Sequence, residues 1–256
     1  MKIRILGAHN VESRKTGYAC LLINNVLAVD AGALTSTLSL KAQARLKAVL
    51  LTHRHYDHVK DLPALGLNFY FLGKSLDVFA TQSVFQELAA HYDDEVLYPD
   101  FTKRPPDGPA FKFHVIEPSR EFAINDYKIL PVAVNHAVPC VGYQITSPAG
   151  KKLFYTSDTG LGLNECWRRI APDMLIVEVT APNRDRDFAV QAGHLTPAQL
   201  QAELEAFRMI KGYLPQVVAL HTNPFLSDAI LAELAGVSAA LKTKILTGLE
   251  GMRLVL

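Results

Sequence analysis

The segment Leu51-Thr52-His53-Arg54-His55-Tyr56-Asp57-His58 decides how this chain is interpreted, because it brings four possible metal ligands into six residues. It follows the apolar run Ala48–Leu51, which has the length and composition of a buried strand. In an extended chain, residues i and i+2 point the same way, so His53 and His55 would hold one ion together. Asp57 and His58 come after the chain has turned and would face a neighbouring position. The other interpretation is a cluster of solvated loop histidines that binds no metal.

Three further candidate ligands lie far away along the chain, and each follows an expected strand. They are His136, Asp158 and His221. Loops beyond strand ends are the usual place for functional side chains on a rigid scaffold. Each residue alone would more often be structural than metal-binding, but together they complete two sets of ligands. Imidazole and carboxylate ligands without a thiolate favour Zn²⁺, with iron or manganese as alternatives.

The distribution of apolar runs predicts a mixed α/β (α+β) fold. Strands are expected at Ile3–Leu6, Tyr18–Ile23, Val26–Val29, Ala48–Leu51, Leu76–Ala80, Phe111–Ile116, Tyr127–Val134, Val141–Thr146, Lys152–Tyr155, Met174–Val177, Val217–Leu220, Lys244–Leu246 and Met252–Leu256. Helices are expected at about Leu38–Leu46, at about Ser83–His91, and from Thr196-Pro197 to about Ile210. Asn24-Asn25 predicts a two-residue hairpin turn. Two sheet-rich halves with covering helices, about 1–110 and 111–256, predict one domain over residues 1–256, arranged as a four-layer αββα sandwich.

These motifs resemble the metallo-β-lactamase superfamily of binuclear hydrolases over nearly the whole chain, from Asp30-Ala31-Gly32 to His221. The resemblance implies the metallo-β-lactamase sandwich fold and two divalent metal ions. It further implies that Asp30 is a buried residue that supports the metal-binding loop. An Asx turn before Gly32 is the structural alternative for Asp30. The implied ligands are His53, His55 and His136 for the first metal, Asp57, His58 and His221 for the second, and Asp158 as the bridge.

Glu178 and His194 indicate which branch of the superfamily the chain resembles. Glu178 ends an expected strand, and His194 precedes a helix, an arrangement similar to tRNase Z and class II cyclic-nucleotide phosphodiesterases. The segment Asn135–Ile145 resembles the same group. A carboxylate raises the basicity of an imidazole and fixes its tautomer, so that the histidine can donate a proton to a departing oxygen. The alternative is an unrelated buried carboxylate and a helix-entry histidine.

The chain offers little for binding a large nucleic acid. Only two expected strands and the turn Pro148-Ala149-Gly150 separate His136 from Asp158, which leaves no room for the tRNA-binding arm that many tRNase Z enzymes carry there. Lysine and arginine total 26 against 25 acidic residues, a net charge of +1, so a nucleic-acid partner is disfavoured. A small-molecule substrate is expected instead.

Three residues are candidates for contacting that substrate. Arg184 and Arg186 lie in a segment, 183–188, that is expected to be a loop and could act as a lid over a phosphate. Tyr56, inside the metal motif, could border the pocket. The alternatives are a solvated loop of self-neutralising charges and ordinary packing of the tyrosine.

Composition favours an ordered protein of a reducing compartment. Apolar residues make up 49% and charged residues 20% of 256 residues, which excludes intrinsic disorder. The three cysteines, Cys20, Cys140 and Cys166, form no CxxC pair and indicate no disulfide framework. No signal-peptide core or apolar stretch of about 18–20 residues is present, so we expect a cytoplasmic protein without membrane attachment. Relatives suggest a homodimer.

Taken together, the residues predict a binuclear metal-dependent hydrolase. The expected reaction is hydrolysis of a small or cyclic phosphodiester by a hydroxide that bridges the metals, with Asp57, Glu178 and His194 in the catalytic machinery. One alternative is hydrolysis of a thioester, lactone or other carbonyl substrate by the same two ions. Others are an RNA-processing nuclease and a metal-binding protein without turnover.

Overall fold

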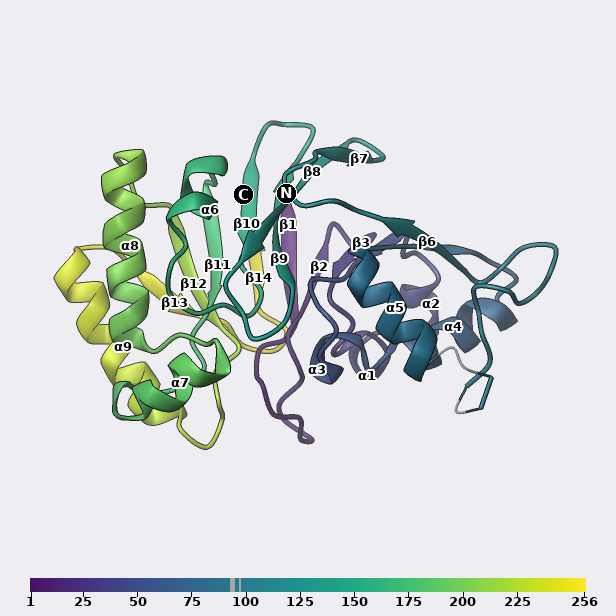
Figure 1. The fold of residues 1–256 in the computed structure, drawn as a ribbon, viewed down its shortest axis with the longest axis horizontal. Coiled ribbons are helices and arrows are strands. Elements are labelled where there is room, and N and C mark those ends of the chain that lie inside the picture. The colour runs from purple at the N-terminus through teal and green to yellow at the C-terminus, as the bar shows by residue number, and fades with distance from the viewer. Residues whose placement is uncertain (93–94, 97) are drawn as a thin grey trace.

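A computed structural model of the chain describes residues 1–92, 95–96 and 98–256. The described residues form two seven-stranded sheets (Figure 1). The first has the order β14 (Arg253–Val255), β1 (Lys2–Gly7), β2 (Cys20–Ile23), β3 (Leu27–Val29), β4 (Ala48–Leu50), β5 (Leu76–Ala80), β6 (Phe111–Val115). The second has the order β13 (Ile245–Thr247), β12 (Gln216–Leu220), β11 (Met174–Glu178), β10 (Lys152–Tyr155), β9 (Cys140–Thr146), β8 (Tyr127–Val134), β7 (Phe122–Ile124).

The helices form the two outer layers. Beside the first sheet lie α1 (Leu34–Thr37), α2 (Leu40–Gln43), α3 (Tyr56–Val59), α4 (Leu62–Phe71) and α5 (Gln82–His91). Beside the second lie α6 (Asn164–Arg169), α7 (Arg186–Ala192), α8 (Pro197–Lys211) and α9 (Ser227–Leu241), with a short 3₁₀ helix at Asn183–Asp185. The mixed α/β class and the two-sheet sandwich expected from the sequence are confirmed.

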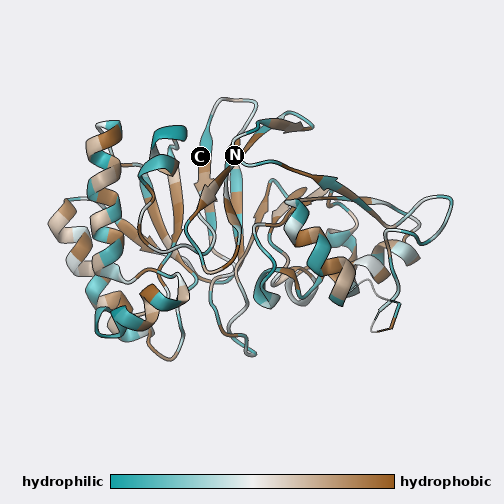
Figure 2. Cartoon of the chain, in the orientation of Figure 1, coloured by the Kyte–Doolittle hydropathy of each residue, from teal (hydrophilic) through white to brown (hydrophobic). Residues whose placement is uncertain are grey.

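Three apolar clusters hold the layers together. The central cluster joins alternate residues of both sheets, such as Ile5 from β1 and Tyr143 from β9. The other two bury the outer face of each sheet under helices, with Phe69 of α4 in one and Trp167 of α6 in the other. Figure 2 shows apolar residues concentrated on the interior strands, while the outer helices alternate between polar and apolar sides. Burial of both faces explains why these strands read as nearly continuous apolar runs.

The position of the functional loops follows from strand direction. Strands β3 to β6 run parallel to one another, and so do β10 to β13. The carboxyl ends of parallel strands meet at one edge of a sheet. The segments that follow β4, β10, β11 and β12 therefore emerge together, and these segments carry most of the candidate ligands.

Most expected elements are present, with strand ends that differ by one or two residues. The Asn24-Asn25 turn is confirmed, because both residues have positive φ angles, 46° and 61°, as a tight hairpin turn needs. The helix expected at Leu38–Leu46 is wrong in extent. Leu38 is extended and ends α1, and Ser39 then caps α2 by accepting a hydrogen bond from the backbone N–H of Ala42. Only Leu40–Gln43 is α-helical within the expected range.

Six helices and one strand of the described residues were not anticipated: α1, α3, α4, α6, α7, α9 and β7. In α4, Gly66 weakens the local helical signal, but its position requires glycine. A Cβ there would lie 2.4 Å from the ring of Phe101, so packing rather than propensity decides the residue. Within the described ranges, no helix combines the length and the apolar character that a membrane crossing needs.

Candidate metal centre

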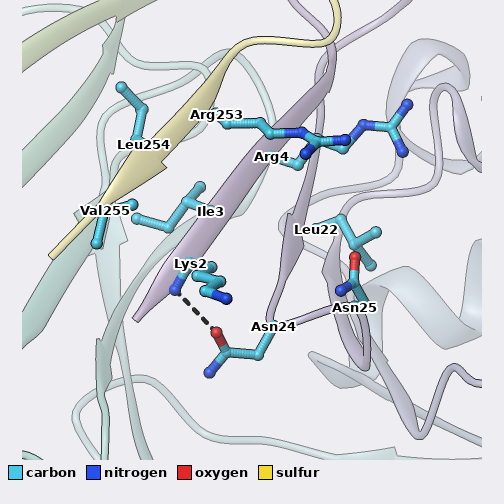
Figure 3. Close-up of a pocket in the computed structure, with 9 residues that line it drawn as sticks. All are labelled: Lys2, Ile3, Arg4, Leu22, Asn24, Asn25, Arg253, Leu254 and Val255. Carbon is cyan, nitrogen blue, oxygen red and sulfur yellow. Dashed lines mark hydrogen bonds between the residues drawn. The ribbon is translucent and has the colours of Figure 1, made fainter.

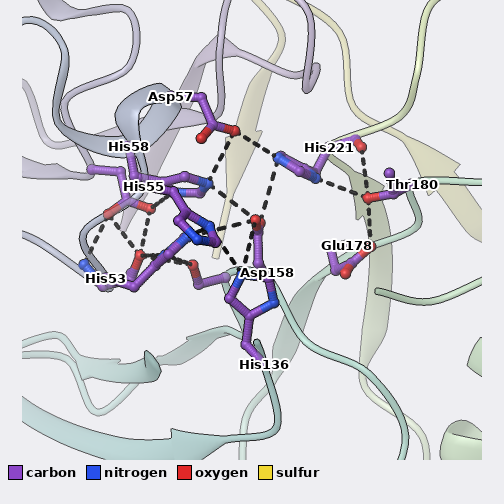
Figure 4. Close-up of polar contacts among 12 residues, drawn as sticks. His53, His55, Asp57, His58, His136, Asp158, Glu178, Thr180 and His221 are labelled. Atoms are coloured by element: carbon purple, nitrogen blue, oxygen red, sulfur yellow. Dashed lines mark hydrogen bonds and ion pairs between the residues drawn. The ribbon is translucent and has the colours of Figure 1, made fainter. Parts of the chain in front are cut away.

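The candidate ligands come together at the edge where the parallel strands end (Figure 4). His53, His55, Asp57 and His58 occupy the segment after β4 and the start of α3, and the other three ligands follow β8, β10 and β12. Two groups result, in each of which one ligand atom per residue lies within 4.8 Å of the others. They are His53, His55, His136 and Asp158, and Asp57, His58, Asp158 and His221. The grouping is the one that the resemblance implies.

Asp158 belongs to both groups, and its two oxygens divide between them. Oδ2 lies 3.7 Å from Nε2 of His53, on the side of the first group. Oδ1 lies 3.3 Å from Nε2 of His58 and 3.4 Å from Nε2 of His221, on the side of the second. The carboxylate is buried in the segment that follows β10. It is therefore placed to connect two ions.

Each of four histidines has its Nδ1 held by a neighbouring oxygen, which leaves Nε2 facing the centre. The acceptors are Thr52 Oγ1 for His53 at 3.1 Å, Asp30 Oδ2 for His58 at 2.7 Å, the Gly193 carbonyl for His136 at 2.8 Å and Thr180 Oγ1 for His221 at 2.9 Å. A hydrogen bond of this kind fixes the tautomer and orientation of a metal ligand. Thr52 and Thr180 carry this role without having been anticipated from the sequence.

The atoms at the centre suit bound cations. Nδ1 of His55 lies 3.1 Å from Nε2 of His53 and 3.2 Å from Nε2 of His136. A tetrahedral zinc ion with Zn–N bonds of about 2.1 Å holds its nitrogen ligands about 3.4 Å apart. His58 Nε2 and Asp158 Oδ1 are buried without a hydrogen-bond partner. Unsatisfied buried polar atoms are costly in a folded protein, and a metal ion between them removes that cost.

The protonation states support the same conclusion. Burial, together with the neighbouring imidazole of His58, holds the pKa of His53 well below its ordinary value. Burial also lowers the pKa of His55 and of His136. Burial raises the pKa of Asp57, but His58 and His221 outweigh it and bring the pKa to about 2. The first group therefore presents neutral imidazoles, the form that binds metals. In the second group, burial lowers the pKa of His58, but the carboxylates of Asp158, Asp30 and Asp57 outweigh it and raise that pKa well above its ordinary value.

Asp30 lies beneath the ligands rather than among them. Its buried carboxylate accepts hydrogen bonds from the Thr52 backbone N–H and hydroxyl, both at 2.9 Å, and from His58. The structure thus brings Asp30 to the base of the metal motif. Asp30, Ser157 and His221 also share an unusual backbone, with φ between 57° and 63°. Left-handed backbone at non-glycine residues is strained, and it persists where the surrounding contacts fix it.

Glu178 and His194 form a pair beside the second group. His194 donates from Nδ1 to Glu178 Oε1 at 2.7 Å, and the hydroxyl of Thr180 donates to Glu178 Oε2 at 2.8 Å. The His194 ring stacks on the ring of His221 with centroids 5.4 Å apart. Burial lowers the pKa of His194, but the Glu178 carboxylate outweighs burial and raises it to about 9. The raised pKa favours the protonated form of an imidazole that lies next to the candidate ligands.

A pocket of about 310 Å³ opens above these groups. Its lining comprises Asn10, Tyr18, His55, Tyr56, Asp57, Asp158, His194 and His221. Tyr56 lies at the mouth with 61% of its surface exposed, and its ring meets that of Tyr18 edge to face at 6.3 Å. Asn10 and Tyr18 were missed, because nothing in their local sequence distinguishes a pocket wall from an ordinary loop.

Segment 183–188 is not a loop, so that expectation is wrong. The 3₁₀ helix at Asn183–Asp185 runs directly into α7. Asn183 fixes it, since its backbone N–H donates to Glu233 and its side-chain oxygen accepts from the N–H of Ala198. Arg184 and Arg186 are exposed on this helical segment, and neither belongs to the pocket lining described above.

Exchange of both arginines tests whether they contact substrate. For Arg184→Gln/Arg186→Gln, we expect KM to stay within about twofold of the wild-type value, because exposed surface substitutions usually change little. Steady-state kinetics on a hydrolysed substrate checks this. A rise in KM of tenfold or more, with kcat unchanged, would restore the lid hypothesis.

Comparison with known proteins shows to which family the chain belongs. Residues 21–221 match the family model of the Beta-lactamase superfamily domain. The chain belongs to the beta-lactamase superfamily. Yeast PDE1 has a similar structure, with a TM-score of 0.85 at 17% identity, and the similarity covers 100% of this chain and 99% of that one. The fold is the metallo-beta-lactamase fold, shared also with the protein YhfI of Bacillus subtilis, which has a TM-score of 0.77 at 17% identity over 99% of this chain and 98% of that one.

Two curated relatives of this superfamily member match only in part. The chain is 31% identical to an octanoyltransferase of Porphyromonas gingivalis over 122 residues, 47% of this chain. It is 30% identical to ribonuclease Z of Methanopyrus kandleri over 102 residues, 40% of this chain. The matches span 23% and 32% of those proteins, well under half of their length.

Outside the range that matches the superfamily, the carboxyl-terminal segment supports the second group of ligands. Glu250 Oε1 accepts hydrogen bonds from Gly17 N at 2.9 Å, from Ala8 N at 3.2 Å and from His9 Nδ1 at 2.6 Å. The Ala8 carbonyl in turn accepts from the backbone N–H of His221 at 2.7 Å. Glu250 therefore fixes the position of Ala8, and Ala8 in turn fixes the backbone of the candidate ligand His221.

We expect Glu250→Ala to weaken binding of one metal ion about 10–100-fold, since loss of groups that orient a ligand has effects of that size. Glu117→Ala, an exposed glutamate paired with Arg120, is the matched control. Metal titration by calorimetry reports the two affinities separately. If both ions bind Glu250→Ala as they bind the wild type, then Glu250 does not position His221.

Proposed function

We propose that this protein is a binuclear metal-dependent phosphodiesterase that acts on a small or cyclic phosphodiester. The observation that carries the proposal is the Glu178–His194 pair, which places a protonated imidazole in the pocket wall beside both ligand groups. Hydrolysis of a phosphodiester needs a proton for the departing alkoxide, and a positioned histidine can supply it. The fold shared with yeast PDE1 is consistent with this reaction.

The chain would hold two divalent ions, with zinc as the proposed metal and manganese or iron as alternatives that the same nitrogen and oxygen ligands accept. Bound at these residues, the ions would lower the pKa of a water molecule and offset the negative charge that develops on the phosphoryl oxygens. Asp158 belongs to both ligand groups and would contact both ions, and Asp57 would contribute an ionised oxygen to the second.

His194 acts on the leaving group. Glu178 holds the Nδ1 proton, so the Nε2 proton is the one available to a departing oxygen. As the bond between phosphorus and that oxygen breaks, the proton moves from Nε2 to the oxygen, and Glu178 stabilises the imidazolium beforehand. His194 then recovers a proton from water before the next turnover.

The shape of the site favours a small substrate. Between His136 and Asp158 the chain contains β9, β10 and a tight turn closed by a hydrogen bond from Gly150 N to the Ser147 carbonyl, and no longer arm. A pocket of about 310 Å³ is near the lower end of the range of about 300–1,000 Å³ for small-molecule sites.

Hydrolysis of bis(p-nitrophenyl) phosphate by protein of known metal content tests the proposal, with p-nitrophenyl acetate as the matched ester. We expect metal-dependent diesterase activity that exceeds esterase activity and disappears with a chelator. A second candidate is hydrolysis of an acyl ester or thioester, which the partial match to an octanoyltransferase favours. Esterase activity without diesterase activity would select that second candidate.

A further inference from the structure

A second pocket lies on the outer face of the first sheet, away from the metal centre (Figure 3). It has a volume of about 350 Å³ and is formed by β14, β1 and β2 with the turn that follows β2. Lys2, Arg4 and Arg253 line it, together with the buried Leu22 and the Asn24-Asn25 turn. Residues 2–4 and 253–255 lie outside the range that matches the superfamily.

The three cations lie on one face because of strand register. Lys2 and Arg4 are two residues apart on β1 and therefore point to the same side of the sheet. Arg4 pairs directly with Arg253 on the antiparallel strand β14. Side chains opposite each other in such a pair have Cβ atoms about 4.5–5.5 Å apart, and like charges at that distance are destabilising. The close-up shows the two arginine side chains extending alongside each other.

No carboxylate in the described part of the chain forms an ion pair with Lys2, Arg4 or Arg253. Some cations elsewhere in the described part of the chain do have such partners, as in the pairs Lys60–Glu12 and Arg54–Glu87. The pocket thus combines three unneutralised positive charges with an apolar floor at Leu22, which is only 3% exposed. An anion between the two guanidinium groups would remove their repulsion.

We propose that this pocket binds a small phosphate-class anion, either free phosphate or the phosphoryl group of a small phosphate ester. Two guanidinium groups offer forked donors that match phosphate oxygens, and Lys2 adds a third charge. β1 connects the pocket to the Ala8–Asn10 segment at the metal centre. The six residues of β1, at about 3.3 Å each, separate the two sites by on the order of 20 Å. The anion site is therefore distinct from the site of hydrolysis.

The test is a titration of the metal-loaded protein with inorganic phosphate, followed by backbone amide chemical shifts. We expect saturable shifts at residues 2–4 and 253–255, separate from any shifts at the metal ligands. In Arg4→Gln/Arg253→Gln the apparent Kd at this pocket should rise about tenfold or more, because two charge-assisted contacts are lost. Arg208→Gln, an exposed arginine on α8, is the control and should bind phosphate as the wild type does.

Two further measurements make the outcome decisive. Without phosphate, Arg4→Gln should have a higher melting temperature than the wild type, since it removes a like-charge pair. Shifts confined to the metal ligands, equal affinity in the double variant, or a lower melting temperature for Arg4→Gln would each overturn the proposal. Tighter binding of a single-stranded 12-mer than of phosphate, lost in the double variant, would assign the pocket to a nucleic-acid backbone instead.

This inference does not rest on the proposed function. The variants alter residues far from the metal ligands, so diesterase activity on bis(p-nitrophenyl) phosphate should be the same in the double variant and in the wild type. A protein that binds phosphate here without diesterase activity would refute the proposed function and leave the anion site standing.

Discussion

Asp158→Ala is expected to remove both metal ions and to lower kcat/KM by about 10³-fold or more, because metal ions supply several kcal/mol of charge stabilisation in such reactions. The reason lies in the position of the carboxylate, whose two oxygens face different ligand groups. Elemental analysis of the purified protein, together with diesterase kinetics, measures both effects.

Two other aspartates make the comparison specific. Asp57 belongs to one ligand group only, so Asp57→Ala should lose one ion and retain the other. Asp187 is exposed on α7, and Asp187→Asn should keep both ions and full activity. If Asp158→Ala retained two ions with wild-type turnover, the shared position of this carboxylate would have no role in metal binding.

His194→Ala is expected to retain both metal ions and to lose activity in proportion to how poor the leaving group is. For an alkyl phosphodiester, loss of a positioned proton donor should cost about 10²–10⁴-fold in kcat. For bis(p-nitrophenyl) phosphate the loss should be much smaller, since nitrophenolate departs without a proton. Equal losses for both substrates would show that His194 does not serve the leaving group.

The pH dependence follows from the Glu178–His194 contact. A proton donor works in its protonated form, and the carboxylate raises the pKa of His194 to about 9. Activity on the alkyl substrate should therefore fall as pH rises through that pKa. Bound cations shift this descending limb to lower pH, so the comparison between variants is the decisive measurement.

Glu178→Gln keeps the shape of the pair and removes the negative charge that stabilises the imidazolium. We expect its descending limb to move to lower pH by roughly 1–2 units, toward the ordinary histidine value of about 6.5. Glu165→Gln, an exposed glutamate on α6, should leave the profile unchanged. An unshifted limb in Glu178→Gln would separate this carboxylate from the titration of His194.

Local sequence was sufficient to find the candidate ligands that the structure brings together, because the chemistry is concentrated at recognisable positions. His53, His55, Asp57 and His58 lie in one short segment after an apolar strand, so spacing alone suggests shared coordination. Most strands could also be predicted, because strands buried on both faces are apolar throughout. The shorter helices were harder to predict. A cap at Ser39 and a packing contact at Gly66 decide the local structure there, and neither is visible in the hydrophobic pattern.

The sequence by itself determined which residues are candidates for binding metal and that they follow strands. Only the tertiary structure decided how those residues are held: Thr52 and Thr180 orient imidazoles, and Glu250 reaches the Ala8 backbone from the far end of the chain. Such contacts join residues up to 242 positions apart. A threonine or glutamate that forms them has no local signature, because its partner is defined by how the sheets pack and not by its sequence neighbours.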